Sequence, residues 1–257
     1  MFSRNNSQRA ACDFDFYHSI KCSVLDALIL IGVTSLYSYT YIHLWSYTTM
    51  QVWVYACQKG GAGKTTLATN MAVAATQAGE KVLIIDTDPQ NSASRWWERR
   101  EEEAPALVRL KPDEVSEGIK LAKANGYTLV IIDTAGRESL QDNQAVLAAT
   151  FCLVPCQPSL ADIEAVYPTV DLLKRNNKNY AFVLTRCPSV GQDQVSAREG
   201  LSALGLVAKP FTVERKAYKL AYATGEGVNE YDAKDKASDE VTALYKWVKQ
   251  KSKRLAA

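Results

Sequence analysis

The sequence contains few of the side chains from which proteins build tight metal clusters. Its 257 residues include six cysteines and two histidines, and the cysteines stand at positions 12, 22, 57, 152, 156 and 187. No two of them form a C-x-x-C pair, which argues against a zinc site, an iron–sulfur cluster and a disulfide framework. Scattered thiols of this kind fit a protein of the reducing cytoplasm.

The sequence also lacks the linkers and repeats that divide a chain into several domains. After residue 50 there is no stretch rich in Pro, Gly or Ser and no internal repeat, so we predict one domain over residues 50–257. A hydrophobic content of 47% is enough for a sizeable core. Residues 1–49 do not match this pattern. We interpret them as an N-terminal extension outside the functional protein, because Met50 directly precedes the first predicted strand.

Two other interpretations of residues 1–49 stay open. The stretch from Ala27 to Ser46 carries no Asp, Glu, Lys or Arg, and a bilayer-spanning helix needs about 20 apolar residues. Its second half is rich in Ser, Thr and Tyr, which argues against a spanning helix. A secretory signal is disfavoured by the acidic residues Asp13, Asp15 and Asp26. The alternatives are a membrane or interfacial anchor and an accessory element packed on the domain.

A glycine-rich turn at residues 58–66 joins an apolar, β-prone run at 52–57 to a helix-like run at 67–75. A strand, a glycine-rich turn and a helix in this order are the context that a phosphate-binding loop requires. The glycines let successive N–H groups point at one anion, and the helix N-terminus adds partial positive charge. The residues expected to contact nucleotide phosphates are Lys59, Gly60, Gly61, Ala62, Gly63, Lys64, Thr65 and Thr66.

Two side chains of this turn suit a nucleotide bound with Mg²⁺. Lys64 can reach the β- and γ-phosphates, and the Thr65 hydroxyl can ligate Mg²⁺. The strict pattern G-x-x-x-x-G-K-[ST] needs glycine at position 58, where this chain has Gln58, and a second lysine, Lys59, follows. A plain turn before a helix is the alternative, but nine ordered residues between a strand and a helix favour the nucleotide site.

With its two lysines, the turn resembles the deviant Walker A motif of the ParA/MinD family of P-loop ATPases. The resemblance implies that ATP and Mg²⁺ are the cofactors and that Lys64 takes part in catalysis. It also implies a homodimer with ATP, in which Lys59 reaches the nucleotide held by the other subunit. The resemblance covers nearly all of residues 50–257. It is closest to the small ParA type, because no helix-turn-helix segment is evident in residues 1–49.

Two predicted strands end in aspartate, within DTDPQ at residues 86–90 and DTAG at residues 133–136. Ligands of open parallel sheets lie beyond the carboxyl ends of the strands. Carboxylates there can hold Mg²⁺ through its water shell or orient an attacking water. A capping or turn aspartate is the alternative for one such residue. Two of them behind apolar strands favour a metal–nucleotide site.

The resemblance also assigns roles to these carboxylates. Residues 86–90 look like the D-x-D-P-Q motif of the family, and residues 133–136 look like its Walker B motif. By this likeness Asp88 positions the water for hydrolysis. Asp133 is the outer-sphere Mg²⁺ carboxylate, and Asp86 supports the same metal site. PCQP at 155–158 and GVNEYD at 227–232 match family patterns more weakly.

Apolar strands alternate with helix-like segments from residue 51 onward. Continuous runs of Val, Ile and Leu indicate a sheet that is covered on both faces. The fold class is therefore α/β, a doubly wound and mostly parallel sheet with helices on both faces. The predicted strands are 51–57, 81–86, 107–110, 128–133, 150–155 and 180–185. The predicted helices are the one from the turn to 77, then 93–103, 113–125, 140–149, 162–175, 192–204, 217–224 and 234–253.

Positive charge gathers in the last third of the chain. Residues 1–173 hold 14 Lys and Arg against 19 Asp and Glu, whereas residues 174–257 hold 16 against 9. This balance suggests a polyanionic partner, with an ordinary solvated face as the alternative. The resemblance implies that ATP-bound dimers bind DNA without sequence preference. The residues expected to bind DNA are Arg186, Arg215, Lys216 and Lys219.

The last basic cluster, at residues 246–254, has a structural explanation. Apolar residues recur here at helical spacing, so we expect a helix docked on the core with a solvated basic face. These apolar residues are Val241, Leu244, Tyr245 and Val248. Leu255 is the only bulky apolar residue after Val248, which argues against membrane insertion of the tail.

The resemblance implies a partition ATPase of the cytoplasm that associates with the nucleoid. Its ATP dimer would coat DNA, and a ParB-like centromere-binding partner would stimulate slow hydrolysis and so separate plasmids or chromosomes. The alternative is a MinD-like or membrane-anchored positioning ATPase. A tyrosine-kinase relative is disfavoured because no tyrosine follows Tyr245, and an iron–sulfur relative by the cysteine spacing. A non-hydrolysing adaptor is disfavoured by the presence of both Lys64 and Asp88.

Overall fold

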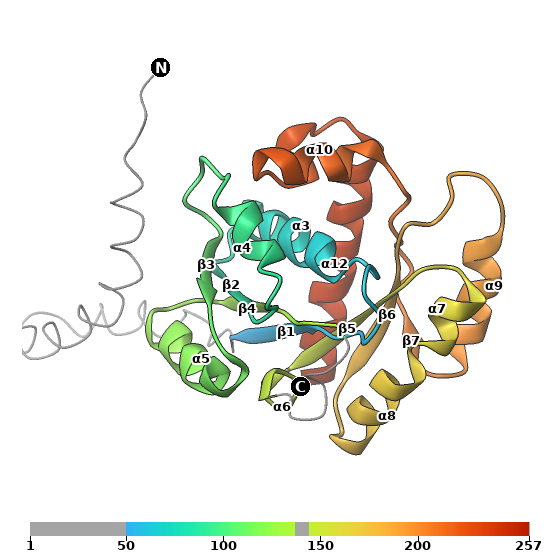
Figure 1. Ribbon diagram of the computed structural model, residues 1–257, viewed down its shortest axis with the longest axis horizontal. Coiled ribbons are helices and arrows are strands. Elements are labelled where there is room, and N and C mark those ends of the chain that lie inside the picture. The colour runs from blue at the N-terminus through green and yellow to red at the C-terminus, as the bar shows by residue number, and fades with distance from the viewer. Residues whose placement is uncertain (1–49, 137–143, 257) are drawn as a thin grey trace, which may run out of the picture. The chain divides into compact units, whose positions relative to one another are not determined.

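The computed structural model describes residues 50–136 and 144–256, and within them seven strands form one sheet (Figure 1). The strand order is β3-β2-β4-β1-β5-β6-β7, and all of the strand pairs are parallel. The strands are β1 (Gln51–Tyr55), β2 (Val82–Asp86), β3 (Ala106–Arg109), β4 (Leu129–Asp133), β5 (Phe151–Cys156), β6 (Tyr180–Leu184) and β7 (Leu206–Val207). The predicted parallel sheet is confirmed.

Helices cover both faces of this sheet, as Figure 1 shows. On one face pack α3 (Lys64–Gln77), α4 (Ser92–Trp97), α10 (Lys216–Thr224), α11 (Val228–Tyr231) and α12 (Lys236–Ala256). On the other pack α5 (Val115–Ala124), α6 (Gln144–Ala148), α7 (Leu160–Glu164), α8 (Tyr167–Arg175) and α9 (Asp193–Ser202). A short 3₁₀ turn, η2 (Pro112–Glu114), leads into α5. The fold is therefore doubly wound, as predicted.

Alternate residues of the strands enter two separate cores. In β1, Trp53 and Tyr55 pack toward α3 and α12, whereas Val52 and Val54 pack toward the helices of the other face. Burial on both faces explains why β1, β2, β4 and β5 are apolar along their whole length. The carboxyl ends of these strands then carry the first polar residues, which places the site at this edge of the sheet.

Two helices differ from their predicted extents. The helix expected at 93–103 ends at Trp97, and beyond it the Arg100 side chain turns inward and donates to the Gly225 carbonyl. The helix expected at 162–175 is divided into α7 and α8, with Pro168 in the first turn of α8, where its missing N–H costs nothing. The sequence patterns did not predict β7 or α11.

The C-terminal helix α12 is docked as its pattern predicts. Val241, Leu244, Tyr245 and Val248 are buried against the face of the sheet that also carries α3. Within the described part of the chain, no helix combines the length and the apolar character needed to cross a membrane. The expectations for residues 1–49, and for the start of the helix predicted at 140–149, lie outside the described residues.

Candidate functional site

The predicted phosphate-binding loop lies between β1 and α3. Gly61 and Gly63 have φ angles of 76° and 99°, which glycine adopts without a steric penalty. Gly63 directly precedes α3, so Lys64, Thr65 and Thr66 form the first turn of that helix. The N–H groups of this turn have no partners within the helix and point out of its N-terminus, as anion binding requires.

Lys64 is folded back over this loop. Its side chain is buried, and Nζ donates hydrogen bonds to the carbonyl oxygens of Cys57 at 3.0 Å and Lys59 at 3.3 Å. Both acceptors belong to the loop, so the ammonium group stays beside the positions that phosphates would take. Moving it from these neutral carbonyls to phosphate oxygens would form stronger, charge-assisted hydrogen bonds.

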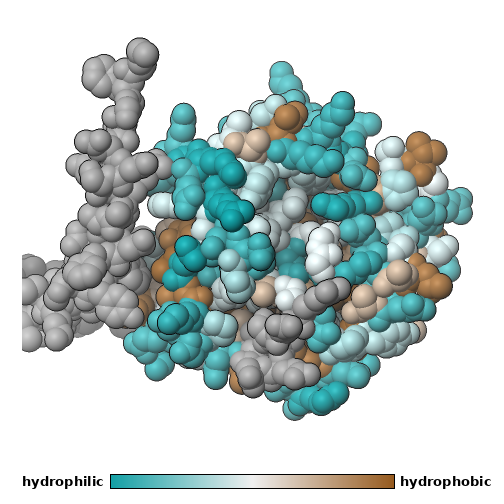
Figure 2. Space-filling model, in the orientation of Figure 1, coloured by the Kyte–Doolittle hydropathy of each residue, from teal (hydrophilic) through white to brown (hydrophobic). Residues whose placement is uncertain are grey.

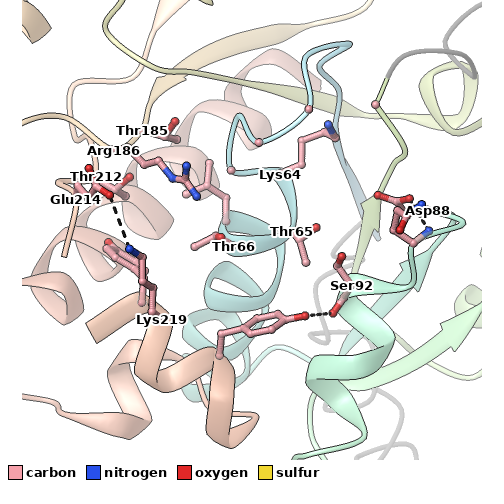
Figure 3. Close-up of a pocket in the computed structure, with 18 of the residues that line it drawn as sticks. Lys64, Thr65, Thr66, Asp88, Ser92, Thr185, Arg186, Thr212, Glu214 and Lys219 are labelled. Atoms are coloured by element: carbon pink, nitrogen blue, oxygen red, sulfur yellow. Dashed lines mark hydrogen bonds and ion pairs between the residues drawn. The ribbon is translucent and has the colours of Figure 1, made fainter. Parts of the chain in front are cut away.

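The loop opens into a cleft of about 690 Å³, a size typical of small-molecule sites (Figure 3). One wall is the phosphate-binding loop. A second wall is the segment from Asp88 to Ser92, and a third comes from the segments around Thr185 and Thr212 and from α10. The lining residues include Gly60, Gly61, Gly63, Lys64, Thr65, Thr66, Asp88, Pro89, Gln90, Ser92, Gly136, Thr185, Arg186, Thr212, Val213, Glu214, Arg215, Tyr218, Lys219 and Tyr222.

Thr65 lines the cleft, and Asp133 is hydrogen-bonded to it from beneath the cleft lining. The Thr65 hydroxyl donates to Asp133 Oδ2 at 2.7 Å, and Asp133 is fully buried. Asp133 Oδ1 has no hydrogen-bond partner within the described residues. Burial raises the pKa of this carboxyl to about 7, against the opposing hydrogen bond from Thr65. An unpartnered carboxylate oxygen beside a threonine hydroxyl fits Mg²⁺, which takes oxygen ligands.

A Mg²⁺ ion bound here would have few ligands from the protein. No group of three or more His, Cys, Asp or Glu side chains within residues 50–136 and 144–256 is arranged to hold a metal ion. Mg²⁺ commonly binds with one or two protein oxygens, and phosphate oxygens and water complete its octahedron. The pair of Thr65 and Asp133 matches that kind of site.

Asp86 and Asp88 lie next to this pair, because Asp86 and Asp133 are register partners on β2 and β4. Asp86 is buried, and its Oδ2 accepts hydrogen bonds from the Ser94 N–H at 2.9 Å and hydroxyl at 2.7 Å. Its Oδ1 accepts from the Asp88 N–H at 3.1 Å. In this geometry Asp86 anchors the loop that carries Asp88. Asp88 lines the cleft and accepts a hydrogen bond from the Gln90 N–H at 2.8 Å.

The other lysine of the loop, Lys59, has a partner that the sequence did not reveal. Its Nζ lies 2.8 Å from Asp162 Oδ2, on α7. About a third of the Lys59 side chain is exposed, whereas Asp162 is buried and its Oδ1 has no partner among the described residues. Gln157, in the predicted PCQP motif, donates to the Gly61 carbonyl at 3.0 Å. The loop is therefore held from outside by the segment that leads into α7.

Three of the four residues predicted to bind DNA line the cleft. Arg186, Arg215 and Lys219 belong to its third wall, whereas Lys216 is exposed at the start of α10. Arg215 forms an ion pair with Glu240 of α12, with Nη2 2.6 Å from Oε1. The Nζ atom of Lys219 lies 4.0 Å from Oε1 of Glu214. Arg186, Arg215 and Lys219 therefore share one wall of the cleft, and Lys216 lies outside its lining.

Arg186 has an unusual backbone conformation, with φ of 50°. Its neighbours are fixed on both sides. The Thr185 hydroxyl donates to the Ala62 carbonyl at 2.8 Å, and the Cys187 N–H donates to the Thr212 carbonyl at 2.9 Å. A non-glycine residue in the left-handed region costs about 1 kcal/mol or more. Figure 3 shows the Arg186 side chain extending into the cleft toward Thr66.

The buried cysteines act as small apolar residues. Cys152 and Cys156 lie within β5. Burial raises the pKa of each thiol to about 12, so neither is ionised at neutral pH. Both pack in the apolar core on the α5–α9 face of the sheet.

Comparison with known proteins identifies this arrangement. Residues 53–226 match the model of the CobQ/CobB/MinD/ParA nucleotide binding domain. The chain belongs to this family. Its ParA and MinD members are P-loop ATPases, so the resemblance of the loop to the deviant Walker A motif is confirmed.

Curated relatives of this family member are named for positioning and partition. A "Maintenance of carboxysome distribution protein A" of Gloeobacter kilaueensis is 33% identical over 194 residues, covering 74% of this chain and 88% of the relative. "Protein ParA" of Rhizobium radiobacter is 26% identical over 190 residues, covering 70% of this chain and 85% of the relative.

Solved structures show the same fold. The septum site-determining protein MinD of Pyrococcus horikoshii, complexed with Mg-ADP, superposes with a TM-score of 0.67 at 17% identity. That match covers 80% of this chain and 99% of the MinD chain. At this level of identity the likeness establishes the fold alone.

Proposed function

We propose that this family member is an ATPase that dimerises with ATP, binds DNA without sequence preference and uses slow hydrolysis to move a cargo. The observation that carries the proposal is the set of groups gathered at one phosphate-binding loop. The loop, Thr65 and Asp88 line the cleft, Asp133 is hydrogen-bonded to Thr65, and Lys59 stands at the start of the loop, paired with Asp162. Each of these groups has a stated task in phosphoryl transfer or in dimer formation.

The catalytic part of the proposal assigns a task to each residue. The N–H groups of residues 60–66 bind the phosphates, and Lys64 moves from the Cys57 and Lys59 carbonyls onto the β- and γ-phosphates. Thr65 would ligate Mg²⁺ and Asp133 would hold it through its water shell, and the ion would supply positive charge to the phosphate oxygens. Asp88 orients the attacking water, while Asp86 fixes the Asp88 loop and supports the metal site.

The dimer part of the proposal rests on Lys59. In the single subunit this lysine is paired with Asp162 of its own chain and remains partly exposed. We propose that it leaves Asp162 when two ATP-bound subunits meet, and that it then contacts the nucleotide of the partner subunit. The new contact is favourable because a triphosphate carries more negative charge than one carboxylate.

The proposed cargo is a plasmid or chromosome, moved with a ParB-like centromere-binding partner in the cytoplasm at the nucleoid. The relative named Protein ParA supports this choice. The basic residues Arg186, Arg215, Lys216 and Lys219 would then contact DNA phosphates. A second candidate is the positioning of a protein assembly over DNA, which is favoured by the relatives named for carboxysome distribution.

The alternative of membrane positioning has less support. The last turns of α12 carry Lys253, Arg254 and one exposed bulky apolar residue, Leu255, which is 44% exposed. An interfacial helix needs a continuous apolar face to enter the lipid boundary. In α12 the apolar face through Val248 is buried against the sheet instead.

The test is binding of the full chain to duplex DNA and, separately, to anionic lipid vesicles, each with ATP, with ADP and without nucleotide. The proposal expects DNA binding that needs ATP, that is lost in Lys59→Ala and that weakens steeply with salt. Vesicle binding should stay near background in every state. Folded protein that binds ATP but no DNA in any state would overturn the DNA part, and ATP-dependent vesicle binding would favour membrane positioning.

A further inference from the structure

The motif at residues 227–232 is not explained by the nucleotide site, because none of these residues lines the cleft. The structure places this motif against α3, the helix that begins at the phosphate-binding loop. The Val228 N–H donates to Asn70 Oδ1 at 2.8 Å, and both groups are buried. Gly227 packs so closely on α3 that a Cβ there would lie 2.8 Å from Val73. The motif is thus fixed to the helix that carries Lys64.

The segment at residues 225–230 also forms hydrogen bonds with the chain that follows α4. Both amino nitrogens of Arg100 donate to the Glu230 carboxylate, at 2.8 and 2.7 Å, and one also donates to the Gly225 carbonyl at 2.8 Å. The Arg100 side chain is 2% exposed and lies over the Trp96 ring. Trp96 Nε1 donates to the Glu226 carbonyl at 2.9 Å. Residues 225–230 therefore connect α3 with α4.

α4 in turn sets the position of the Asp88 loop. Ser94 of α4 donates two hydrogen bonds to the Asp86 carboxylate, which also accepts a hydrogen bond from the Asp88 N–H. Across the cleft, the Tyr222 hydroxyl of α10 donates to the Ser92 carbonyl at 2.9 Å, a bond that is drawn in Figure 3. α4 has only six residues, so its own helical bonds cannot orient it. Its orientation depends on these tertiary contacts.

We propose that Tyr222, Glu230, Arg100 and Ser94 form a brace that positions Asp88 relative to the phosphate-binding loop. Tyr222 is the positioning residue on the cleft side of the brace, because its hydroxyl joins α10 in the cleft wall to Ser92 at the start of α4. Glu230 and Arg100 form the other side of the brace, where they join α11 to the chain that follows α4. The outer face of this region is hydrophilic, as Figure 2 shows over α4, whereas the inward contacts are buried. The proposal rests on the proposed hydrolysis at Asp88.

The brace predicts that its loss slows hydrolysis more than it weakens nucleotide binding. Tyr222→Phe keeps the ring, which also faces the Arg99 guanidinium, and removes only the hydroxyl. We expect kcat to fall about threefold to tenfold, the change that one lost hydrogen bond produces. KM and Kd for ATP should stay within about twofold, because the phenylalanine ring keeps the shape of this part of the cleft wall and the phosphate-binding loop is untouched. Ser94→Ala should show the same separation of kcat from KM.

The experiment is steady-state ATP hydrolysis by the full-length wild type, Tyr222→Phe, Ser94→Ala and the control Tyr167→Phe, with melting temperatures and ATP affinities for each. Tyr167 is exposed on α8, far along the chain from the brace, and its variant should match the wild type. Hydrogen exchange of the backbone amides of residues 88 and 90–92 should become faster in Tyr222→Phe and not in the control.

The results separate the brace from the proposed function on which it rests. Lower kcat with unchanged KM and melting temperature in both brace variants supports the proposal. A wild-type kcat in Tyr222→Phe and Ser94→Ala, with hydrolysis intact in the wild type, would overturn the brace alone. Absence of hydrolysis in a folded wild type that binds ATP would overturn the proposed function, and the brace with it. Glu230→Gln is not used as the sole test, because it removes the negative charge that faces the buried Arg100 guanidinium and so is expected to lower stability as well.

Discussion

The two sides of the cleft differ in how the chain builds them. The phosphate side is one continuous segment of nine residues, 58–66, which runs from the loop after β1 into the first turn of α3. The opposite side is assembled from segments around Thr185, Thr212 and α10, which are separated along the chain and joined by tertiary hydrogen bonds. A continuous motif fixes its chemistry locally, whereas an assembled wall acquires its chemistry only when the fold forms.

The sharpest test of the phosphate side is removal of its buried lysine. Lys64→Ala should weaken ATP binding by about 100-fold or more, because a charge-assisted contact to the phosphates is lost. Isothermal titration with ATP measures the change, and Lys120→Ala serves as the control because Lys120 is exposed on α5. Near wild-type affinity in Lys64→Ala would contradict the assignment of this loop as the phosphate site.

The second variant separates binding from chemistry on the same side. Asp88→Asn should lower kcat by about 100-fold or more, the usual contribution of a group that orients or deprotonates the attacking water. ATP affinity should be retained, since Asp88 is held by backbone hydrogen bonds rather than by the phosphate-binding loop. Asp171→Asn on the exposed face of α8 is the matched control. Hydrolysis at the wild-type rate in Asp88→Asn would assign the water-orienting role to another residue.

A smaller effect is expected from the ion pair that retains Lys59. Asp162→Asn keeps the shape of the side chain and removes the negative charge beside Lys59 Nζ. The freed lysine should favour the ATP-bound dimer, so that half-dimerisation occurs at a protein concentration about fivefold lower. Sedimentation with a non-hydrolysable ATP analogue measures this concentration. A higher concentration than in the wild type would mean that Asp162 supports the dimer instead of restraining Lys59.

These residues also show how far the sequence leads. The sheet, its parallel strands and the positions of Lys64, Thr65, Asp86, Asp88 and Asp133 follow from strand ends and from one glycine-rich turn, which are local patterns. The Lys59–Asp162 pair and the Tyr222–Ser92 bond join elements far apart in the sequence. The spacing of these residues along the chain does not predict either contact. Their distance in space depends on how the segments after β1 and β5, and the helix α10, are placed in the fold. The sequence shows that Arg186, Arg215 and Lys219 are basic, but their charge does not predict that they line the cleft.

The smallest expected effect concerns the assembled side, and it decides what its basic residues do. Arg186 extends into the cleft from a left-handed backbone, so Arg186→Ala should weaken the binding of both ATP and ADP about threefold. Lys216→Ala, just outside the cleft lining, should leave nucleotide affinity unchanged and weaken DNA binding. Arg186→Gly removes the same side chain but relieves the backbone strain, so its melting temperature should exceed that of Arg186→Ala. If both Arg186 variants bind nucleotide normally and lose DNA binding, the arginine belongs to the DNA surface, and the two sides of the cleft do not share the nucleotide.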